Sequence, residues 1–324
     1  MSEAVVLMAY GSPDRIVDVP AYYSDIRGGR PVEPEHLQDL VDRYRRLGIE
    51  DSNPLNEITE ATRTALEAEL GLPVFTGMKH WTPRIAEAAY RAAAADTVVG
   101  LVLAPHYSRL SIAGYREQLE DGLRAAWANN GRLDRSVQTG TWAEPRPPET
   151  APPSRRLGGR AELVFVESWH DEPGFLDLLA ERIRGTSAHV VFTAHSLPAR
   201  ILDEGDPYQD QLLETSRLVA EAAGVDDWTF SFQSESPTGE PWLGPDVLDH
   251  LDDLHARDVR DVLVCPVGFV ADHLEIRWDL DHEAKDKADE LGMTLERIEM
   301  PNDDPAFITV LAGIVRRALA KAPA

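Results

Sequence analysis

Continuous apolar runs alternate with longer segments of helical periodicity along this chain. The clearest strand candidates are the runs at 4–10, 97–105, 161–168, 189–196 and 261–269. Runs that are apolar throughout, rather than at every second residue, are typical of parallel strands buried on both faces. Amphipathic helical patterns occupy 34–47, 59–70, 83–95 and 208–224. This alternation predicts an α/β protein with parallel sheets and right-handed crossover connections.

A faint internal repeat divides the chain into two halves. VVLMAYGSP at 5–13 is matched by VVFTAHSLP at 190–198, and LVLAPHYS at 101–108 by VLVCPVGF at 262–269. The repeat predicts two related doubly wound domains that face one another, residues 1–150 and residues 161–324, with the C-terminal helix packing back. Residues 143–160 are rich in Pro, Gly and Arg without periodicity, which predicts an insertion or linker.

Composition narrows the class of protein. The 324 residues are 43% hydrophobic and 27% charged, as in ordinary soluble globular proteins. No apolar run approaches the ~20 residues that span a membrane, and no export signal is recognisable at the start, so a cytoplasmic protein is expected. The net charge of −24 argues against nucleic acid and anionic membranes as partners. The single cysteine, Cys265, excludes an internal disulfide and a self-contained four-cysteine metal or iron–sulfur site.

Candidate chemistry lies where the predicted strands end, because ligands of open α/β sheets bind beyond the carboxyl ends of the strands. The polar residues at those ends are Tyr10, His106, Tyr107, His195, Asp272 and Glu275. No P-loop, GxGxxG, HExxH or GxSxG motif is present, so direct nucleotide use is not expected. Imidazole, carboxylate and phenol ligands suit Fe(II) and neighbouring divalent metals rather than copper(I) or an iron–sulfur cluster.

An acidic stripe runs through GFVADHLEIRWDLDHEAKDK at 268–287. Its five carboxylates are Asp272, Glu275, Asp279, Glu283 and Asp286. On an α-helix they would fall within an arc of roughly 80° and repel one another. The stripe is therefore either a solvated face or a site for a cation.

Several motifs together resemble the ferrochelatase family. They are MAYGSP, YYSDIRGGRPVEPEHLQDLVDRY, LAPHYS, ESWHDEP, TAHSLP, QSESPTGEPWLGPD and CPVGFVADHLE, and they occur in the family's order from about residue 4 to the C-terminus. Tyr10 and the Arg-bearing stretch at 27–43 are most similar to the coproporphyrin ferrochelatases of Gram-positive bacteria. The resemblance implies two Rossmann-like domains, a porphyrin cleft between them and a monomer. It also implies ATP-independent insertion of Fe(II) into coproporphyrin III, giving coproheme.

The resemblance assigns roles to individual positions. His195 and Glu275 match the family's metal-site pair and are expected to bind the substrate Fe(II) and accept the pyrrole protons together. Tyr10 is expected on the opposite face of the macrocycle. Further porphyrin contacts are expected at or beside Arg27, Arg43, Tyr44, Ser52 and Tyr115. The register at Ser52 is open, because the family has Ser directly before Pro, where this chain has Asn53.

The remaining candidates each have two interpretations. Asp279 and Glu283 form either a hydrated path for Fe(II) or a solvated face, whereas Asp286 is expected to be exposed and Asp272 is a ligand or a helix cap. Lys79 and His80 either flank the mouth of the cleft or have a structural role. Trp242 is expected to pack its loop, and His106 to be a satisfied buried imidazole or an indirect partner of the metal site.

Three alternatives remain open from the sequence. A protoporphyrin IX chelatase would handle two propionates instead of four, and a cobalt chelatase would rely on histidines without VGFVADHLE. A non-catalytic tetrapyrrole or metal carrier would not need the His195 and Glu275 pair. The iron–sulfur cluster that some members of the family carry is not expected here, because neither the mid-chain insertion nor the C-terminal region contains cysteine. A downstream coproheme decarboxylase is a partner implied by the resemblance alone.

Overall fold

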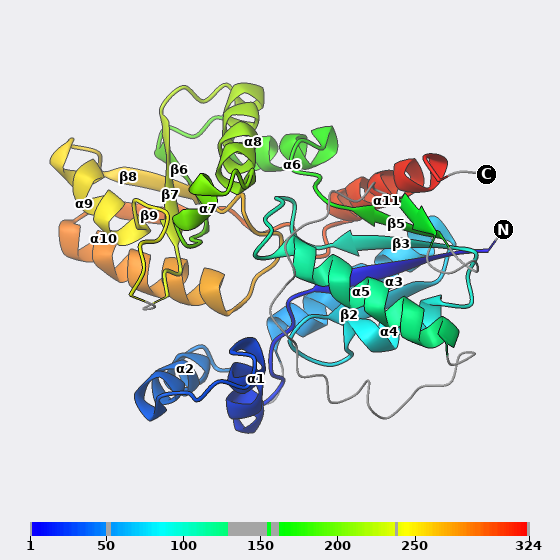
Figure 1. The fold of residues 1–324 in the computed structure, drawn as a ribbon. Coiled ribbons are helices and arrows are strands. Elements are labelled where there is room, and N and C mark those ends of the chain that lie inside the picture. Colours follow the sequence, from blue (N-terminus) through cyan, green and yellow to red (C-terminus); the bar gives the residue numbers. More distant parts are fainter. Residues whose placement is uncertain (1, 50–52, 129–153, 157–161, 237–238, 323–324) are drawn as a thin grey trace. The chain divides into compact units, whose positions relative to one another are not determined.

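The chain forms two compact units, each built around one sheet. The computed structural model describes residues 2–49, 53–128, 154–156, 162–236 and 239–322 (Figure 1). The first unit comprises Met1–Ala104, Arg109–Ser168 and Asn302–Ala324, and the second comprises Pro105–Ser108 and Trp169–Pro301. The insertion or linker predicted at 143–160 lies outside the described residues except for 154–156.

The first unit has a sheet with the strand order β2-β1-β3-β5-β4. Its strands are β1 (Glu3–Ala9), β2 (Val74–Met78), β3 (Thr97–Val102), β4 (Ser154–Arg156) and β5 (Glu162–Val166). All neighbours are parallel except β4, which runs antiparallel to β5. Strand β1 is an interior strand, and Val5 pairs with Val74 on one side and Val99 on the other. Its apolar side chains are buried, as a strand covered on both faces requires.

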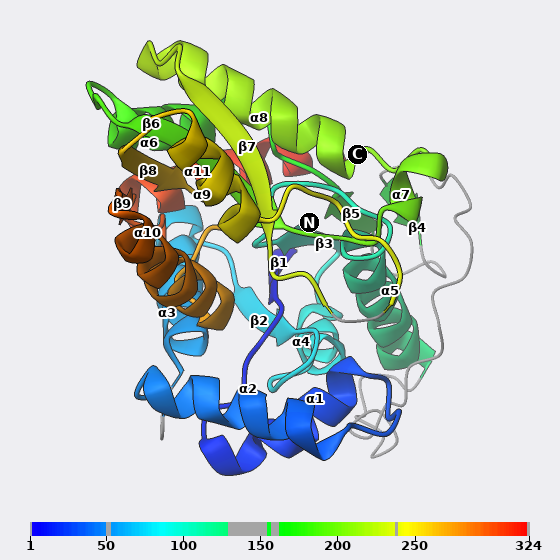
Figure 2. The ribbon, with the colours of Figure 1, turned by 90° about the vertical axis from the view of Figure 1, so that its left-hand side faces the viewer.

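Helices cover both faces of this first sheet. They are α1 (Val19–Ile26), α2 (Pro34–Arg46), α3 (Pro54–Leu70), α4 (Ile85–Ala92), α5 (Ile112–Ala128) and α11 (Pro305–Ala320), with a short 3₁₀ turn η1 (Ile16–Asp18). Helices α4 and α5 pack together on one face and α3 and α11 on the other, while α1 and α2 form a pair after β1 (Figure 2). Helix α3 begins at an Asn53 cap followed by Pro54 and ends at the left-handed Gly71.

The sheet of the second unit repeats the order of the four parallel strands of the first sheet. Its order is β7-β6-β8-β9, with β6 (His189–His195), β7 (Trp228–Gln233), β8 (Asp261–Cys265) and β9 (Thr294–Arg297), all parallel. In chain order, both sheets place the second strand beside the first and the third on its other side. The chain therefore reverses direction across the sheet between β1 and β3, and again between β6 and β8. Such switch points are where doubly wound folds bind ligands.

The second sheet is also covered on both faces. Its helices are α6 (Pro173–Ile183), α7 (Arg200–Asp203), α8 (Tyr208–Ala223), α9 (Val247–Ala256), the π-helix η3 (Ile276–Ala284) and α10 (Lys285–Leu291). Helices α6 and α8 pack together on one face, and α9, η3 and α10 on the other. Ile276 and Leu280 of η3 join a core cluster with Val264 of β8. The stripe of acids thus lies on a helix whose apolar side is anchored to the sheet.

The predicted α/β class and the five predicted strands are confirmed, as β1, β3, β5, β6 and β8. The assignment of 161–168 to the second domain is wrong for its strand, because β5 hydrogen-bonds to β3 in the first sheet. Helix α11 belongs to the first unit, where it contacts α3, β3 and β5.

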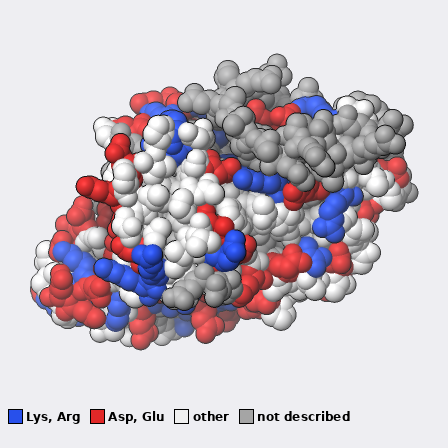
Figure 3. Space-filling view, turned by 90° about the horizontal axis from the view of Figure 1, so that it is seen from below, with Lys and Arg blue, Asp and Glu red and all other residues white. Residues whose placement is uncertain are grey.

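None of the helices in the described part of the chain combines the length and apolarity needed to cross a membrane. Acidic side chains are interspersed with Lys and Arg on the face in Figure 3.

Candidate functional site

His195 stands at the switch point of the second sheet. It is the last residue of β6, and its neighbour β8 leads into the segment that carries Glu275. The segment approaches β6 closely, since Gly268 N donates to Thr193 O at 3.2 Å. A Cβ at position 268 would lie 2.5 Å from the Cβ of Ala194, so only glycine fits there without displacement. The glycine of the CPVGF motif is therefore required by its close packing against Ala194 of β6.

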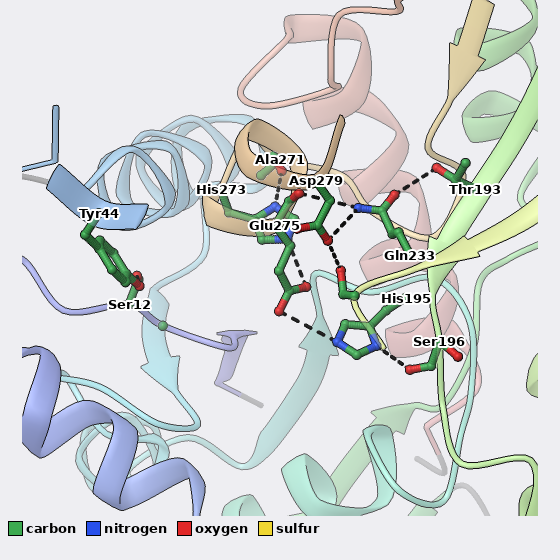
Figure 4. Close-up of polar contacts among 12 residues, drawn as sticks. Ser12, Tyr44, Thr193, His195, Ser196, Gln233, Ala271, His273, Glu275 and Asp279 are labelled. Atoms are coloured by element: carbon green, nitrogen blue, oxygen red, sulfur yellow. Dashed lines mark hydrogen bonds and ion pairs between the residues drawn. The ribbon is translucent and has the colours of Figure 1, made fainter. Parts of the chain in front are cut away.

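The His195 and Glu275 side chains face one another (Figure 4). His195 Nε2 lies 3.7 Å from Glu275 Oε1, and the two side chains are 31% and 36% exposed. The other ring nitrogen, Nδ1, donates to the carbonyl oxygen of Ser196. Because a carbonyl only accepts, Nδ1 carries the proton, and a neutral His195 turns the Nε2 lone pair toward the carboxylate. Two acceptors at this separation favour a cation or a proton between them.

Glu275 also contacts a second imidazole. Its Oε2 lies 3.6 Å from Nε2 of His273, whose Nδ1 donates to Ala271 O at 2.8 Å. Burial favours the neutral acid, but the positive charges that His195 and His273 carry when protonated, and the His273 hydrogen bond, outweigh it and lower the pKa of Glu275 to about 2. Burial lowers the pKa of His273, yet Glu275 and the Ala271 carbonyl raise it overall. The site therefore contains an ionised carboxylate, that of Glu275, between the imidazoles of His195 and His273.

Asp279 is a buried anchor of the π-helix. It is 7% exposed and accepts hydrogen bonds from Ser234 Oγ and from Gln233 Nε2, the latter at 3.5 Å (Figure 4). Gln233 also donates to the backbone oxygen of Glu275 at 3.5 Å and accepts from Thr193 Oγ1 at 3.0 Å. This network ties the start of η3 to the ends of β6 and β7.

The rest of the stripe separates into different environments. Asp272 pairs with Arg297 at 3.0 Å, and Asp286 is exposed as predicted. Glu283 is half-buried. The π-helix replaces the α-helical geometry assumed for the stripe, because its hydrogen bonds run from residue i to i+5. Among the residues that the structure describes, no group of three or more His, Cys, Asp or Glu side chains is arranged to hold a metal ion.

Tyr10 marks the corresponding position in the first unit, directly after β1. Its side chain is 40% exposed, and its ring centroid lies 4.6 Å from that of His80. The next residue, Gly11, has a φ of +83°, and a Cβ there would lie 2.8 Å from Trp81. The turn that exposes Tyr10 therefore requires glycine.

Lys79 and Tyr115 lie together in the first unit. Lys79 Nζ is 4.8 Å from the centroid of the Tyr115 ring and donates to Ser111 O at 3.1 Å. Burial lowers the pKa of Lys79 to about 8. Tyr115 is only 3% exposed, and burial raises the pKa of its phenol. Lys79 is thus a half-buried cation that contacts the ring of a predicted porphyrin contact.

Tyr44 and Asn53 connect the loop after β1 to two helices. The Tyr44 hydroxyl lies 2.7 Å from Ser12 Oγ, and Asn53 Nδ2 donates to the same Ser12 oxygen at 2.8 Å. Asn53 also caps α3 by accepting from Leu55 N at 3.1 Å. Tyr44 is 1% exposed, so this hydroxyl contact is buried. The predicted contact Ser52 lies outside the described residues.

The two predicted propionate-binding arginines have different surroundings. Arg27 follows the last residue of α1, and its buried Nε has no hydrogen-bond partner among the described residues. Arg43 lies in the last turn of α2 and pairs with Asp39 at 3.0 Å. Arg45 pairs with Asp42 and is exposed. Arg27 is therefore a half-buried guanidinium with one unsatisfied donor, its Nε, which an oxygen acceptor could satisfy.

Two further candidates are packed. His106 Nε2 lies 2.9 Å from Thr215 Oγ1, while its buried Nδ1 has no partner within the described ranges, so the imidazole is only half satisfied. Burial lowers the pKa of His106. The Trp242 ring centroid lies 6.4 Å from that of His195, which places this indole beside the site.

Sequence reasoning missed the partners that orient these groups. His273, Gln233 and Ser234 all lie inside the motifs VADHLE and QSES, whose polarity was visible, but their contacts depend on tertiary structure. Asp25 and Arg84, which hold His80, are far apart in the sequence and lie on α1 and just before α4. Neither had a signal that distinguished it from other surface charges.

The sheets and the strand-end pair define a chelatase-like α/β protein. The chain resembles in fold a multi-domain protein from Deinococcus radiodurans whose crystal structure was described as similar to chelatases, with a TM-score of 0.52 and 12% identity. The alignment covers 96% of this chain and 54% of that protein, and it shows the fold alone. The sequence model of the ferrochelatase family matches residues 2–137 and 151–319. The chain belongs to the ferrochelatase family.

Curated relatives cover nearly the whole chain. A protein named ferrochelatase from Herpetosiphon aurantiacus is 41% identical over 96% of this chain and 97% of its own length. A coproporphyrin III ferrochelatase from Bacillus subtilis is 36% identical over 98% of both chains. A second protein of that name, from Bacillus pumilus, is also 36% identical, over 97% of this chain and 96% of its own length. Fe(II) is the substrate metal of this enzyme family.

Proposed function

We propose that this protein inserts Fe(II) into coproporphyrin III and releases coproheme without using ATP. The observation that carries the proposal is the pairing of His195 Nε2 with Glu275 Oε1 at the end of β6. A porphyrin must lose two pyrrole protons, and the metal must lose its hydration shell. A neutral imidazole and an ionised carboxylate can serve both needs.

In this mechanism, Glu275 and His195 act as one unit. Glu275 is ionised at neutral pH, because its pKa is lowered to about 2, and it supplies the charge that attracts Fe(II). His195 presents Nε2, since its Nδ1 proton is committed to Ser196 O, and the nitrogen either ligates the metal or takes a pyrrole proton. Gln233 and Asp279 fix the backbone from which Glu275 projects.

The first unit is proposed to supply the porphyrin contacts. Tyr10 is exposed at the end of β1 and would face the macrocycle. The unsatisfied Nε of Arg27 and the guanidinium of Arg43 are the proposed propionate donors. Tyr44, Ser52 and Tyr115 remain proposed contact positions, with Tyr44 and Tyr115 nearly buried.

Coproporphyrin III is preferred over protoporphyrin IX for two reasons. Relatives at 36–37% identity carry the name coproporphyrin III ferrochelatase. Residues 27–46 also hold five arginines, Arg27, Arg30, Arg43, Arg45 and Arg46, in a chain of net charge −24. Four propionates need more cations than two, so this local enrichment favours the tetracarboxylate.

The deciding experiment mixes purified protein anaerobically with Fe(II) and either coproporphyrin III or protoporphyrin IX, and follows the visible spectrum. Rapid conversion of coproporphyrin to its iron complex, with slower conversion of protoporphyrin, is expected. Metallation of neither would remove the enzyme proposal. A porphyrin that binds without any spectral change over time would instead identify a carrier.

Two arginine substitutions test the proposed role of Arg27 in binding the porphyrin propionates. Arg27→Gln is expected to weaken coproporphyrin binding more than protoporphyrin binding, whereas Arg15→Gln, in an exposed pair with Asp18, should leave both unchanged. Equal weakening for both porphyrins would leave Arg27 without a role in choosing the substrate. A coproheme-decarboxylating enzyme is the proposed next partner, and protein mixed with it should transfer the product.

A further inference from the structure

A three-residue cluster in the first unit joins α1, the end of β2 and the start of α4. Asp25 Oδ1 lies 2.9 Å from Arg84 Nη2, and its Oδ2 lies 3.0 Å from both Arg84 Nη1 and His80 Nδ1. Arg84 Nη1 also donates to Lys79 O at 3.2 Å. Three elements are thus fixed through one carboxylate.

The cluster is shielded from solvent. The side chains of Asp25, His80 and Arg84 are 16%, 13% and 24% exposed. A two-point guanidinium–carboxylate pair that is mostly buried fixes geometry more firmly than a surface ion pair. Burial raises the pKa of Asp25, but His80 and Arg84 outweigh it and lower it overall, so the carboxylate remains ionised.

His80 connects this cluster to Tyr10 through its backbone and its ring. Its backbone N donates to Tyr10 O at 2.9 Å, and its ring centroid lies 4.6 Å from the Tyr10 ring. Because the Asp25 carboxylate only accepts, Nδ1 of His80 carries a proton and the ring cannot rotate freely. Removal of Asp25 would release the ring that supports the exposed phenol.

We propose that Asp25 and Arg84 are positioning residues that act through His80 to hold Tyr10 in the orientation in which it meets the porphyrin. This inference rests on the proposed function, since it takes Tyr10 to be a porphyrin contact. Neither Asp25 nor Arg84 touches the substrate in this scheme. Their role is to order a support that would otherwise sample several rotamers.

The test is a double-mutant cycle in the full-length protein, with coproporphyrin III as the probe and no iron present. The dissociation constant is measured by quenching of intrinsic fluorescence. Asp25→Asn should raise this constant about 10-fold. In a His80→Ala background, the same substitution should change it less than about twofold, because the residue through which Asp25 acts is already absent.

One control and one conservative substitution separate positioning from a general loss of structure. Asp18→Asn removes an exposed bidentate pair with Arg15 from the adjacent η1 turn and should leave porphyrin affinity unchanged. Arg84→Lys keeps the charge but loses the two-point grip, and an intermediate weakening is expected. If Asp25→Asn fails to fold, Arg84→Lys alone is carried through the cycle with His80→Ala.

The outcomes are decisive in both directions. An undiminished effect of Asp25→Asn in the His80→Ala background, or unchanged affinity in Asp25→Asn and Arg84→Lys, would overturn the inference. With iron added, the KM for porphyrin should rise in Asp25→Asn while kcat falls less than about threefold. Failure of the unaltered protein to metallate any porphyrin would instead refute the proposed function and leave the measured coupling intact.

Discussion

His195 Nε2 and Glu275 Oε1 lie 3.7 Å apart, and the remaining nitrogen of the imidazole is already committed to the Ser196 carbonyl. The two groups therefore form a preorganised acceptor pair that only a cation or a proton completes. Removing either member leaves the other without its counterpart.

Substitution His195→Ala is expected to abolish iron insertion while leaving porphyrin binding measurable. The loss should be about 10²–10⁴-fold in kcat/KM, the range typical of a positioned proton acceptor. His282→Ala removes an exposed imidazole from the π-helix η3, and this control variant should retain activity. Anaerobic metallation assays and fluorescence titrations measure the two quantities, and full activity in His195→Ala would remove this residue from the mechanism.

Substitution Gly268→Ala is expected to damage both stability and the metal site. Its Cβ would lie 2.5 Å from the Cβ of Ala194 and 2.8 Å from the Cα, so the loop must move away from β6. Overpacking of this kind costs about 1–3 kcal/mol. Gly313→Ala provides the contrast, because its nearest neighbour at 3.4 Å is the flexible end of Arg317. Urea unfolding compares the two, and equal stabilities would contradict the steric account.

Two substitutions at Ser234 distinguish the loss of its hydrogen bond from the strain of its left-handed backbone conformation. Ser234 has a φ of +64°, and its hydroxyl donates to the buried Asp279 carboxylate. Both Ser234→Ala and Ser234→Gly lose this hydrogen bond, but only glycine adopts the left-handed conformation without strain. The glycine variant should be about 1 kcal/mol more stable than the alanine variant. Thermal unfolding in parallel gives the order, and the reverse order would show that strain is absent.

Lys79 should make stability rise with pH in the alkaline range. The unfolded chain keeps this proton until about pH 10.4, whereas burial lowers the pKa of Lys79 in the folded protein to about 8. Between these values the unfolded state binds more protons, so the free energy of unfolding increases with pH.

The matching variant is Lys79→Met, which has no such titration. Relative to it, the unaltered protein should gain at most about 3 kcal/mol between pH 7 and pH 10, since one pKa unit corresponds to about 1.4 kcal/mol. Denaturant titrations at pH 7, 8.5 and 10 test this. A stability difference that stays constant over the series would mean that the ammonium is solvated.

The sequence allowed prediction of strands that are buried on both faces, and their neighbours were harder to find. Strands β1, β3, β6 and β8 are interior strands with continuous apolar runs. The unpredicted β2, β7 and β9 all lie at sheet edges, where one side lacks a partner strand and the apolar pattern is weaker. Strand β5 was assigned to the second domain but pairs with β3 in the first sheet. This pairing depends on tertiary structure and leaves no local sequence pattern.

The candidate site, like the fold, was only partly predictable from the sequence. Residues at strand ends were identified because parallel strands end at one edge, and His195 and Glu275 do come together. The π-helix was not predictable, since its i to i+5 hydrogen bonds leave no periodicity distinct from an α-helix over so short a span. The polar network around Asp279 joins residues 40–46 positions apart and appears only once the sheet has formed.

Helix α11 gives the first unit a dependence on the order of synthesis. The segment from Asn302 onward supplies a layer over α3, β3 and β5, yet the ribosome makes it after every residue of the second unit. A nascent chain can complete its inserted second unit while one face of the earlier sheet is still uncovered. Slow translation near the end of the message would therefore prolong the exposure of an apolar surface, and chaperone binding should concentrate on β3 and β5.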